Sequence, residues 1–264
     1  MTDIRHTPDH RNIDIDRVGI KNLVYPLVLR DQKNELQYTT AEINFYVDLP
    51  RELKGTHMSR FVEVVNHYRG EIDLRHIDEM LDYARDRFSA DTVHLEMTFP
   101  YFISKSSPVS GAEGLMSYSC TIAASSRSGE GSQSILTVRV PVMAVCPCSK
   151  QISDRGAHNQ RSLVALSVLT NEFLWLEELI VLVEKSASSE VFSHLKREDE
   201  KYITEHAYDN PVFVEDIVRN VAFEIQSDKR IDWFSVRAEN FESIHSHNAY
   251  ASIERDLKSD RRSS

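Results

Sequence analysis

The sequence passes twice through the same order of strand-like and helix-like segments, and this order constrains the fold more than any other feature. Residues 43–49 and 93–99 alternate apolar and polar side chains, as half-buried strands do. Between them, residues 58–68 and 72–88 carry apolar side chains at the spacing of two helices. Strands on both sides of a helix pair favour a mixed α and β fold.

The second half of the chain repeats this order, although no repeat is visible at the level of individual residues. Helix patterns occupy residues 175–187 and the segment after Asn210 and Pro211, which would provide an N-cap and a first-turn proline. The segments with strand patterns are residues 115–124, 135–142, 163–169, 232–239 and 249–253.

The doubled order predicts two tandem modules. We expect the first to cover residues 19–111 and the second to cover residues 112–254, with most of the candidate site residues in the second. The end segments 1–18 and 255–264 show neither pattern, so we expect them to be mobile. The 264 residues are enough for a substantial core.

Composition and charge exclude several classes of protein. Three cysteines are too few for a disulfide framework, which predicts a reducing, cytoplasmic location. Residues 1–17 are polar and charged, unlike a signal peptide. The apolar run 174–183 contains Glu177 and Glu178 and is too short to span a bilayer, so we expect no membrane association. A net charge of −10 disfavours nucleic-acid binding.

Two cysteines and a histidine lie close together in the sequence, and they suggest a metal site. Cys146, Cys148 and His158 are flanked by the cations Lys150 and Arg161. Thiolate and imidazole are ligands of borderline-soft divalent metals. The spacing is not that of a zinc finger, and an incomplete ligand set indicates an open, catalytic metal. The alternative is a structural cysteine beside a surface histidine.

A third, harder ligand would have to come from elsewhere. The acidic run at residues 197–202 could supply it, or it could be a solvated charge cluster. His245 and His247 could shuttle protons or bind metal, because histidine titrates near neutrality, or they could form a polar turn. Glu242 lies beside them.

Two further features could bind a substrate. Glu215 is a surface residue of the helix after Pro211, but a carboxylate can also accept the N–H and NH₂ groups of a guanine or pterin ring. The segment from Lys54 to Arg60 precedes a helix and could bind phosphate, or Thr56 could simply cap the helix. The sequence has no dinucleotide-binding glycine motif and no P-loop.

Taken together, the motifs closely resemble the GTP cyclohydrolase type IB family, a prokaryotic alternative to the common type I enzyme. The resemblance covers residues 12–253, which is nearly the whole chain. The motifs that carry it are KGTHMSRF at 54–61, SPVSG at 107–111, CPCSK at 146–150, GAHNQRS at 156–162, DEKY at 199–202 and ENFESIH at 239–245.

The resemblance implies a fold, a reaction and an assembly. The fold would be the α+β tunnelling fold, in two tandem ββααββ-like modules whose antiparallel sheets close into barrels when the protein oligomerises. The reaction would convert GTP and water to formate and 7,8-dihydroneopterin triphosphate, the first step of folate or pterin synthesis. The enzyme would be a hydrolase that acts on a cyclic amidine and a homotetramer with active sites between subunits.

The resemblance also implies roles for individual residues. One divalent metal, Mn²⁺, Zn²⁺ or Fe²⁺, would be bound by Cys146, His158 and Glu200. Cys148 would sit in the active site without being a main ligand, and His245 and His247 would transfer protons. Glu215 would anchor the guanine and Glu242 would support the site. As a separate hypothesis from their charge and position, the residues expected to hold the triphosphate are Thr56, His57, Ser59, Arg60, Lys150 and Arg161.

Two other functions compete with this interpretation. A nitrile reductase of queuosine synthesis shares the fold and uses a cysteine thioimide and NADPH, but needs no metal. A non-catalytic binding protein would use a closed, four-ligand metal to hold its loop together and would not turn over GTP. Metal content and GTP turnover separate the three functions.

Overall fold

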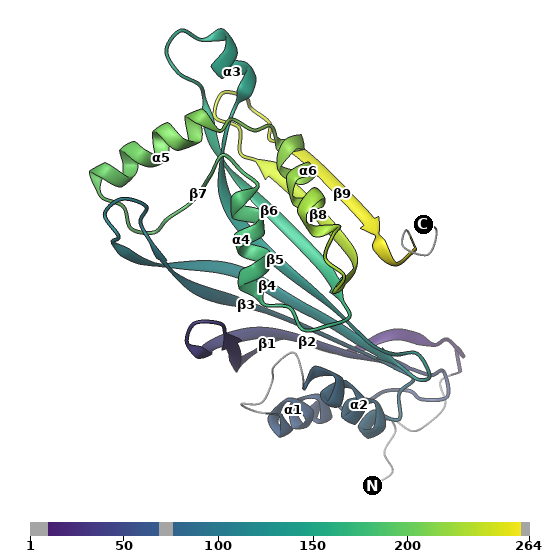
Figure 1. The fold of residues 1–264 in the computed structure, drawn as a ribbon. Coiled ribbons are helices and arrows are strands. Elements are labelled where there is room, and N and C mark those ends of the chain that lie inside the picture. The colour runs from purple at the N-terminus through teal and green to yellow at the C-terminus, as the bar shows by residue number, and fades with distance from the viewer. Residues whose placement is uncertain (1–9, 69–75, 260–264) are drawn as a thin grey trace. The chain divides into compact units, whose positions relative to one another are not determined.

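The computed structural model describes residues 10–68 and 76–259, and it confirms the α+β fold (Figure 1). The strands are β1 (Ile15–Asp31), β2 (Glu35–Leu49), β3 (Thr92–Ser106), β4 (Glu113–Arg127), β5 (Gly131–Val145), β6 (Asn159–Thr170), β7 (Ser189–Glu190), β8 (Ile231–Asn240) and β9 (Ala249–Asp256). The helices are α1 (Met58–His67), α2 (Ile77–Phe88), α3 (Pro147–Ile152), α4 (Leu176–Lys185), α5 (Arg197–Asp209) and α6 (Val214–Ile225).

The described strands follow one hydrogen-bonded order. That order is β1-β2-β3-β4-β5-β6-β8-β9, and the short β7 pairs with β5. The pairs β1/β2, β2/β3, β6/β8 and β8/β9 are antiparallel. Consecutive strands are therefore neighbours almost throughout, as is common for elements that follow one another in sequence.

The chain forms two compact units. The first unit contains residues 1–100 and 121–135, and the second contains residues 101–120 and 136–264. Strands β3, β4 and β5 each contribute residues to both units. The predicted module boundary between residues 111 and 112 lies in the β3–β4 connection, so the tandem-module division stays a prediction.

The first unit buries an aromatic cluster between its helices and strand β2. The ring of Phe61 in α1 lies 5.5 Å from Phe45 in β2 and 4.3 Å from Phe88 in α2. Phe45 and Phe61 are fully buried. Aromatic contacts of this size stabilise a core beyond the burial of area alone.

In the second unit, α4 contacts β6 and α6 contacts β8 and β9, on one face of these strands (Figure 1). Helix α6 buries Val214, Ile217, Val218, Val221 and Ile225, whereas Phe213, which precedes the helix, is 40% exposed. A buried charged group lies deeper in this unit: Lys105 donates to Glu184 at 2.8 Å, and Tyr118 donates to the same oxygen at 2.7 Å. Burial raises the pKa of Glu184, and the hydrogen bond from Lys105 opposes that shift.

The predicted helix start at Asn210 and Pro211 is wrong. Asn210 is instead the C-cap of α5, and its amide donates to the carbonyl of Ala187 at 3.0 Å. The N-cap of α6 is Phe213, whose backbone N–H donates to the carboxylate of Asp216 at 3.0 Å. A carboxylate at the third helical position satisfies the helix start, so no asparagine is needed there.

Four elements among the described residues were not predicted, and one of them is the two-residue strand β7. Strand β1 begins at Ile15, inside the end segment 1–18, and few of its side chains are buried, which weakens its alternation. Helix α3 is too short to show a helical period. Helix α5 has a polar surface that hides its periodicity. Residues 72–75 of the predicted second helix lie outside the described residues. No helix among the described residues has the length and hydropathy needed to cross a bilayer.

Candidate active site around Cys146 and His158

Cys146 stands at the junction between β5 and α3. It is the N-cap of α3 and has an extended backbone, while Pro147 occupies the first helical position, where its missing N–H costs nothing. The Cys146 sulfur accepts a hydrogen bond from the backbone N–H of Ser149 at 3.4 Å. The start of α3 therefore orients this thiol, which is only partly buried.

His158 is tied to the same helix start by its backbone. Its carbonyl accepts the N–H of Cys146 at 3.1 Å, and its own N–H donates to the Ser149 hydroxyl at 3.1 Å. Gly156, with φ +120°, allows the turn that brings the chain back before β6. The structure thus brings together the loop segments that carry Cys146 and His158.

A glutamine that was not predicted connects His158 to Glu242. The Nδ1 atom of His158 lies 3.1 Å from Gln160 Oε1, and Gln160 Nε2 lies 3.5 Å from Glu242 Oε1. The backbone N–H of Phe241 donates to the carbonyl of Arg161 at 3.0 Å, which holds Glu242 beside β6. Gln160 was not singled out from the sequence, because an amide is ordinary there; its burial in the structure is what requires hydrogen-bond partners.

His245 and His247 lie in the exposed loop between β8 and β9. Their rings stack with centroids 5.2 Å apart and planes inclined by 22°, so the His-x-His spacing does place them side by side. Asn248 closes the loop by donating to Glu239 at 2.7 Å. The loop begins next to Glu242, and both imidazoles are accessible to solvent.

Glu215 is exposed in the first turn of α6. The backbone N–H of Val212 donates to the carbonyl of Val145 at 3.2 Å. This bond holds the chain before α6 against the residue that precedes Cys146. Glu215 is therefore three residues from a segment that contacts the Cys146 junction.

Glu200 is not brought to Cys146 and His158 in one chain. Lys150 of α3 contacts Tyr208 near the end of α5, and Glu200 lies eight residues earlier, about 12 Å along the helix axis. Figure 1 shows the start of α5 well away from α3. Within residues 10–68 and 76–259, no three His, Cys, Asp or Glu side chains gather in a group that could hold a metal ion.

The acidic run before Tyr202 is not simply a solvated cluster. Asp199 is fully buried, and it accepts hydrogen bonds from the N–H groups of Val109 and Ser110 at 2.9 Å, from the Ser110 hydroxyl at 2.6 Å and from the N–H of Lys196 at 2.9 Å. Burial alone would raise its pKa, but these hydrogen bonds outweigh burial and hold the pKa well below the usual range. The SPVSG segment (residues 107–111) therefore donates three of the hydrogen bonds that this carboxylate accepts.

The cations and the remaining cysteines have distinct surroundings. Lys150 Nζ donates to the backbone carbonyl of Tyr208 at 2.5 Å. It also lies 4.3 Å from the centre of the Tyr208 ring. Arg161 and Cys148 are exposed. Burial raises the pKa of Cys120 to about 12, so this thiol is not poised to ligate a metal.

The predicted phosphate-binding residues lie at the start of α1 in the first unit. His57, rather than Thr56, is the N-cap, and its side chain makes no capping hydrogen bond. Ser59 and Arg60 occupy the first helical turn, which contains no acidic residue. The alternative role of Thr56 as the cap is therefore wrong.

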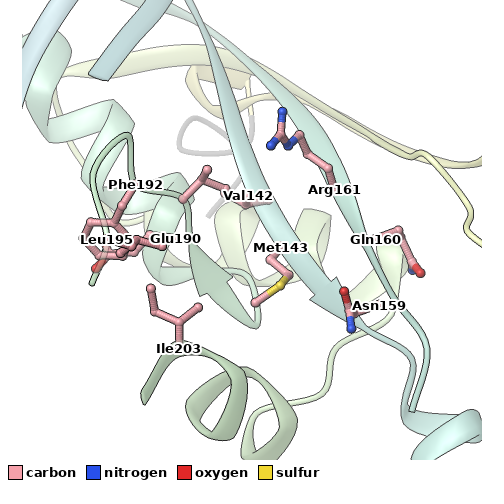
Figure 2. A pocket seen from close by; sticks show the side chains of 10 residues that line it. Val142, Met143, Asn159, Gln160, Arg161, Glu190, Phe192, Leu195 and Ile203 are labelled. Carbon is pink, nitrogen blue, oxygen red and sulfur yellow. The ribbon is translucent and has the colours of Figure 1, made fainter. Parts of the chain in front are cut away.

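A cavity of about 360 Å³ lies between β5, β6 and the chain from Glu190 to Ile203 (Figure 2). Its walls are mainly apolar, from Val142, Met143, Phe192 and other side chains. Gln160 and Arg161 reach it from β6. Glu190 is held by an ion pair with Lys105 at 3.1 Å.

Solved structures identify the fold class. The uricase from Arthrobacter globiformis superposes with a TM-score of 0.51 at 9% identity, over 91% of this chain and 93% of that one. The urate oxidase from Bacillus subtilis 168 gives 0.53 at 9% identity, over 91% and 98%. These likenesses, together with the antiparallel strand order, place the chain in the tunnelling fold.

The sequence identifies the family within that fold. Residues 1–251 match the family described as type I GTP cyclohydrolase folE2. A protein called GTP cyclohydrolase FolE2 from Syntrophobacter fumaroxidans is 52% identical over 97% of this chain and 99% of its own. One with the same name from Syntrophus aciditrophicus is 54% identical over 97% and 100%. The chain belongs to this family, as the sequence motifs predicted.

Proposed function

We propose that this protein is a GTP cyclohydrolase that converts GTP and water to formate and 7,8-dihydroneopterin triphosphate, as the first step of folate or pterin synthesis. It would act as a hydrolase of a cyclic amidine in the cytoplasm. The observation that carries the proposal is the backbone tie between Cys146 and His158, which joins two soft ligands in a chain of this family.

The donor chemistry fits a divalent metal. A thiolate and an imidazole suit Zn²⁺, Fe²⁺ or Mn²⁺ when a harder oxygen ligand completes the set, and we assign that role to Glu200. Such a metal, when bound, would lower the pKa of a water molecule for attack at C8 of the guanine. Cys146 and His158 would hold the metal, with Cys148 nearby on the exposed side of α3.

The protein's own groups would bind and orient the substrate. Glu215 would accept the N–H and NH₂ groups of the guanine, with Glu242 in support. His245 and His247 would exchange protons with the ring nitrogens and the ribose, because adjacent imidazoles can act in turn as acid and base. Thr56, His57, Ser59 and Arg60 would hold the triphosphate, with Lys150 and Arg161 contributing positive charge.

We further propose a homotetramer with active sites between subunits. Strands β1 and β9 end the strand order of the described residues, so each has only one hydrogen-bonded neighbour. A free strand edge can pair with another chain and so close a barrel. The separation of Glu200 from Cys146 along α5 supports an active site that is completed on assembly.

Formate release and the fluorescence of the oxidised pterin test this function directly. We expect both from metal-reconstituted protein with GTP, and a chelator should abolish them. Cys146→Ala, His158→Ala and Glu200→Ala should each lose metal and reduce turnover at least about 100-fold. Glu215→Ala should lose turnover and retain metal.

Two results would contradict the proposal. Full metal retention by Cys146→Ala would overturn the ligand assignment. If folded, oligomeric protein formed no product with any divalent metal, the cyclohydrolase function would be wrong. The next assay would then be NADPH oxidation with a deazaguanine nitrile.

A further inference from the structure

We propose that Gln160 is a positioning residue that sets the tautomer of His158, and that Glu242 determines the direction of the Gln160 amide. The inference rests on the proposed function, because it assigns His158 to the metal. It adds a role for two residues whose side chains are linked in the structure and that together prepare His158 Nε2 as a ligand.

The Gln160 side chain is held between His158 and Glu242. It lies at the start of β6 and is only 7% exposed. Its carbonyl oxygen lies 3.1 Å from His158 Nδ1 and its amide nitrogen 3.5 Å from Glu242 Oε1. If either partner of a buried, hydrogen-bonded amide is removed, the folded protein loses stability.

The hydrogen-bonding capacities of these groups allow one arrangement. A carboxylate can only accept hydrogen bonds, so the NH₂ end of Gln160 must face Glu242. The carbonyl end then faces His158 Nδ1, and a carbonyl can only accept. Nδ1 must therefore carry the hydrogen. The reversed amide would place two acceptors against each other at Glu242.

The consequence for His158 concerns its other nitrogen. With the hydrogen on Nδ1, the neutral ring has its lone pair on Nε2, as a ligand requires. The backbone of His158 is already held by Cys146 and Ser149, so the ring is the part that remains to be oriented. A hydrogen-bond acceptor at the far nitrogen is how proteins usually orient a metal-binding histidine.

Glu242 is itself held in place by the strand ladder. Ser162 in β6 pairs with Asn240 in β8, and the N–H of Phe241 donates to the carbonyl of Arg161. Glu242 follows directly. The chain from Glu242 through Gln160 to His158 is thus supported at both ends by backbone hydrogen bonds.

Two substitutions of Gln160 separate the two contacts. Gln160→Met keeps a similar volume and removes both hydrogen bonds, so Mn²⁺ or Zn²⁺ affinity, measured by chelator competition, should fall about 10- to 100-fold. Gln160→Glu keeps an acceptor for His158 but loses the donor to Glu242. It should retain metal affinity close to that of the unchanged protein while its turnover of GTP falls.

A matched control removes a different buried amide from the same ladder. Asn240 is 2% exposed, and its side chain accepts a hydrogen bond from the Ser162 hydroxyl and not from His158. Asn240→Leu should lower thermal stability as Gln160→Met does, and it should leave metal affinity unchanged. This comparison separates positioning from general loss of stability.

The tautomer can be observed directly by solid-state ¹⁵N NMR of the full chain, labelled with ¹⁵N at histidine and freed of metal by a chelator. The His158 signal, identified by its loss in His158→Gln, should show hydrogen on Nδ1 in the unchanged protein and in Gln160→Glu. In Gln160→Met it should shift toward a mixture of tautomers. This readout does not depend on turnover.

The outcomes distinguish this inference from the proposed function. Unchanged metal affinity and an unchanged His158 tautomer in folded Gln160→Met would overturn the inference, even if formate is released. Equal losses of metal in Gln160→Glu and Gln160→Met would also overturn it, because the acceptor would then not matter. Absence of formate from the unchanged protein would instead contradict the proposed function and leave the tautomer result standing.

Discussion

The first turns of α1 and α5 differ in the acidic and capping groups that they offer to their backbone N–H groups. Each helix start has backbone N–H groups without helical partners and a partial positive charge. In α5, Asp199 accepts the N–H of Lys196 and also binds the 107–111 loop, and two more acidic residues lie in the same turn. In α1, the first turn has no acidic residue, and the N-cap His57 side chain makes no capping bond.

The difference is that a carboxylate of the chain itself accepts hydrogen bonds at the start of α5, whereas the first turn of α1 contains no acidic residue. Asp199 uses its charge to join α5 to the SPVSG loop, which is a structural task. The α1 start keeps the cation Arg60 and the hydroxyl of Ser59 within its first turn. This contrast is consistent with the phosphate-binding role proposed for α1.

The largest effect should follow from Asp199→Ala. The substitution leaves the N–H groups of Val109, Ser110 and Lys196 without their acceptor, so α5 should detach from the loop more often. We expect the melting temperature to fall, and hydrogen exchange at the amides of α5 to speed up about tenfold or more. Glu198→Ala, in the same turn but exposed, is the control. Equal exchange rates in both variants would contradict the structural role of Asp199.

Acid should weaken the same attachment. The pKa of Asp199 is depressed in the folded protein, so its stabilising contribution is fully present above the usual aspartate value of about 4. That contribution is lost as pH falls below this value toward the lower folded pKa. Melting temperatures between pH 6 and pH 3 should therefore decline less steeply in Asp199→Asn. A decline as steep as in the unchanged protein would exclude Asp199 as the titrating group.

A reciprocal exchange tests whether the α1 start is left open for phosphate. Ser59→Glu should stabilise α1 by about 0.3–1 kcal/mol through the helix dipole but raise the KM for GTP about tenfold, because the new carboxylate competes with phosphate. Glu198→Ser, the matching position of α5, should lower stability slightly and leave KM unchanged. Steady-state kinetics and thermal melts measure both. An unchanged KM in Ser59→Glu would remove α1 from the phosphate site.

The smallest effect is expected from a substitution in the 107–111 loop, which donates hydrogen bonds to Asp199. Gly111 has φ +65°, and an added Cβ would meet no atom within 4 Å, so Gly111→Ala should cost only backbone strain, about 1 kcal/mol. Gly129→Ala is the matched control, with φ +79° and equally open space in the β4–β5 turn. Both should lower stability similarly in denaturant titrations. Only Gly111→Ala should also speed exchange in α5.

The sequence predicted elements whose apolar faces are regular. The buried face of α6, through Val214, Ile217, Val218 and Val221, was visible as a helical period, and β2 and β3 were visible as alternation. Strand β1 and helix α5 were not predicted because few of their side chains are buried. Periodicity reports burial, so an element that buries little leaves little pattern.

Some residues of the candidate site were recognisable from the sequence, and others were not. Cys146, His158, His245 and His247 were recognisable because their chemistry is uncommon and their spacing is short. Gln160 and Asp199 were not, since an amide or a carboxylate is ordinary until its burial is known. The acidic run 197–202 was a candidate from its composition, the resemblance selected Glu200 within it, and one chain does not bring Glu200 to Cys146.

The sequence by itself determined the family, the mixed α and β character and the residue types available for chemistry, because these depend on local pattern and on long matching motifs. Only the tertiary structure decided that Asp199 joins α5 to the 107–111 loop and that Gln160 connects His158 to Glu242. These contacts join residues some 80 to 90 positions apart. Their formation depends on strand pairing and burial, which no short stretch of sequence encodes.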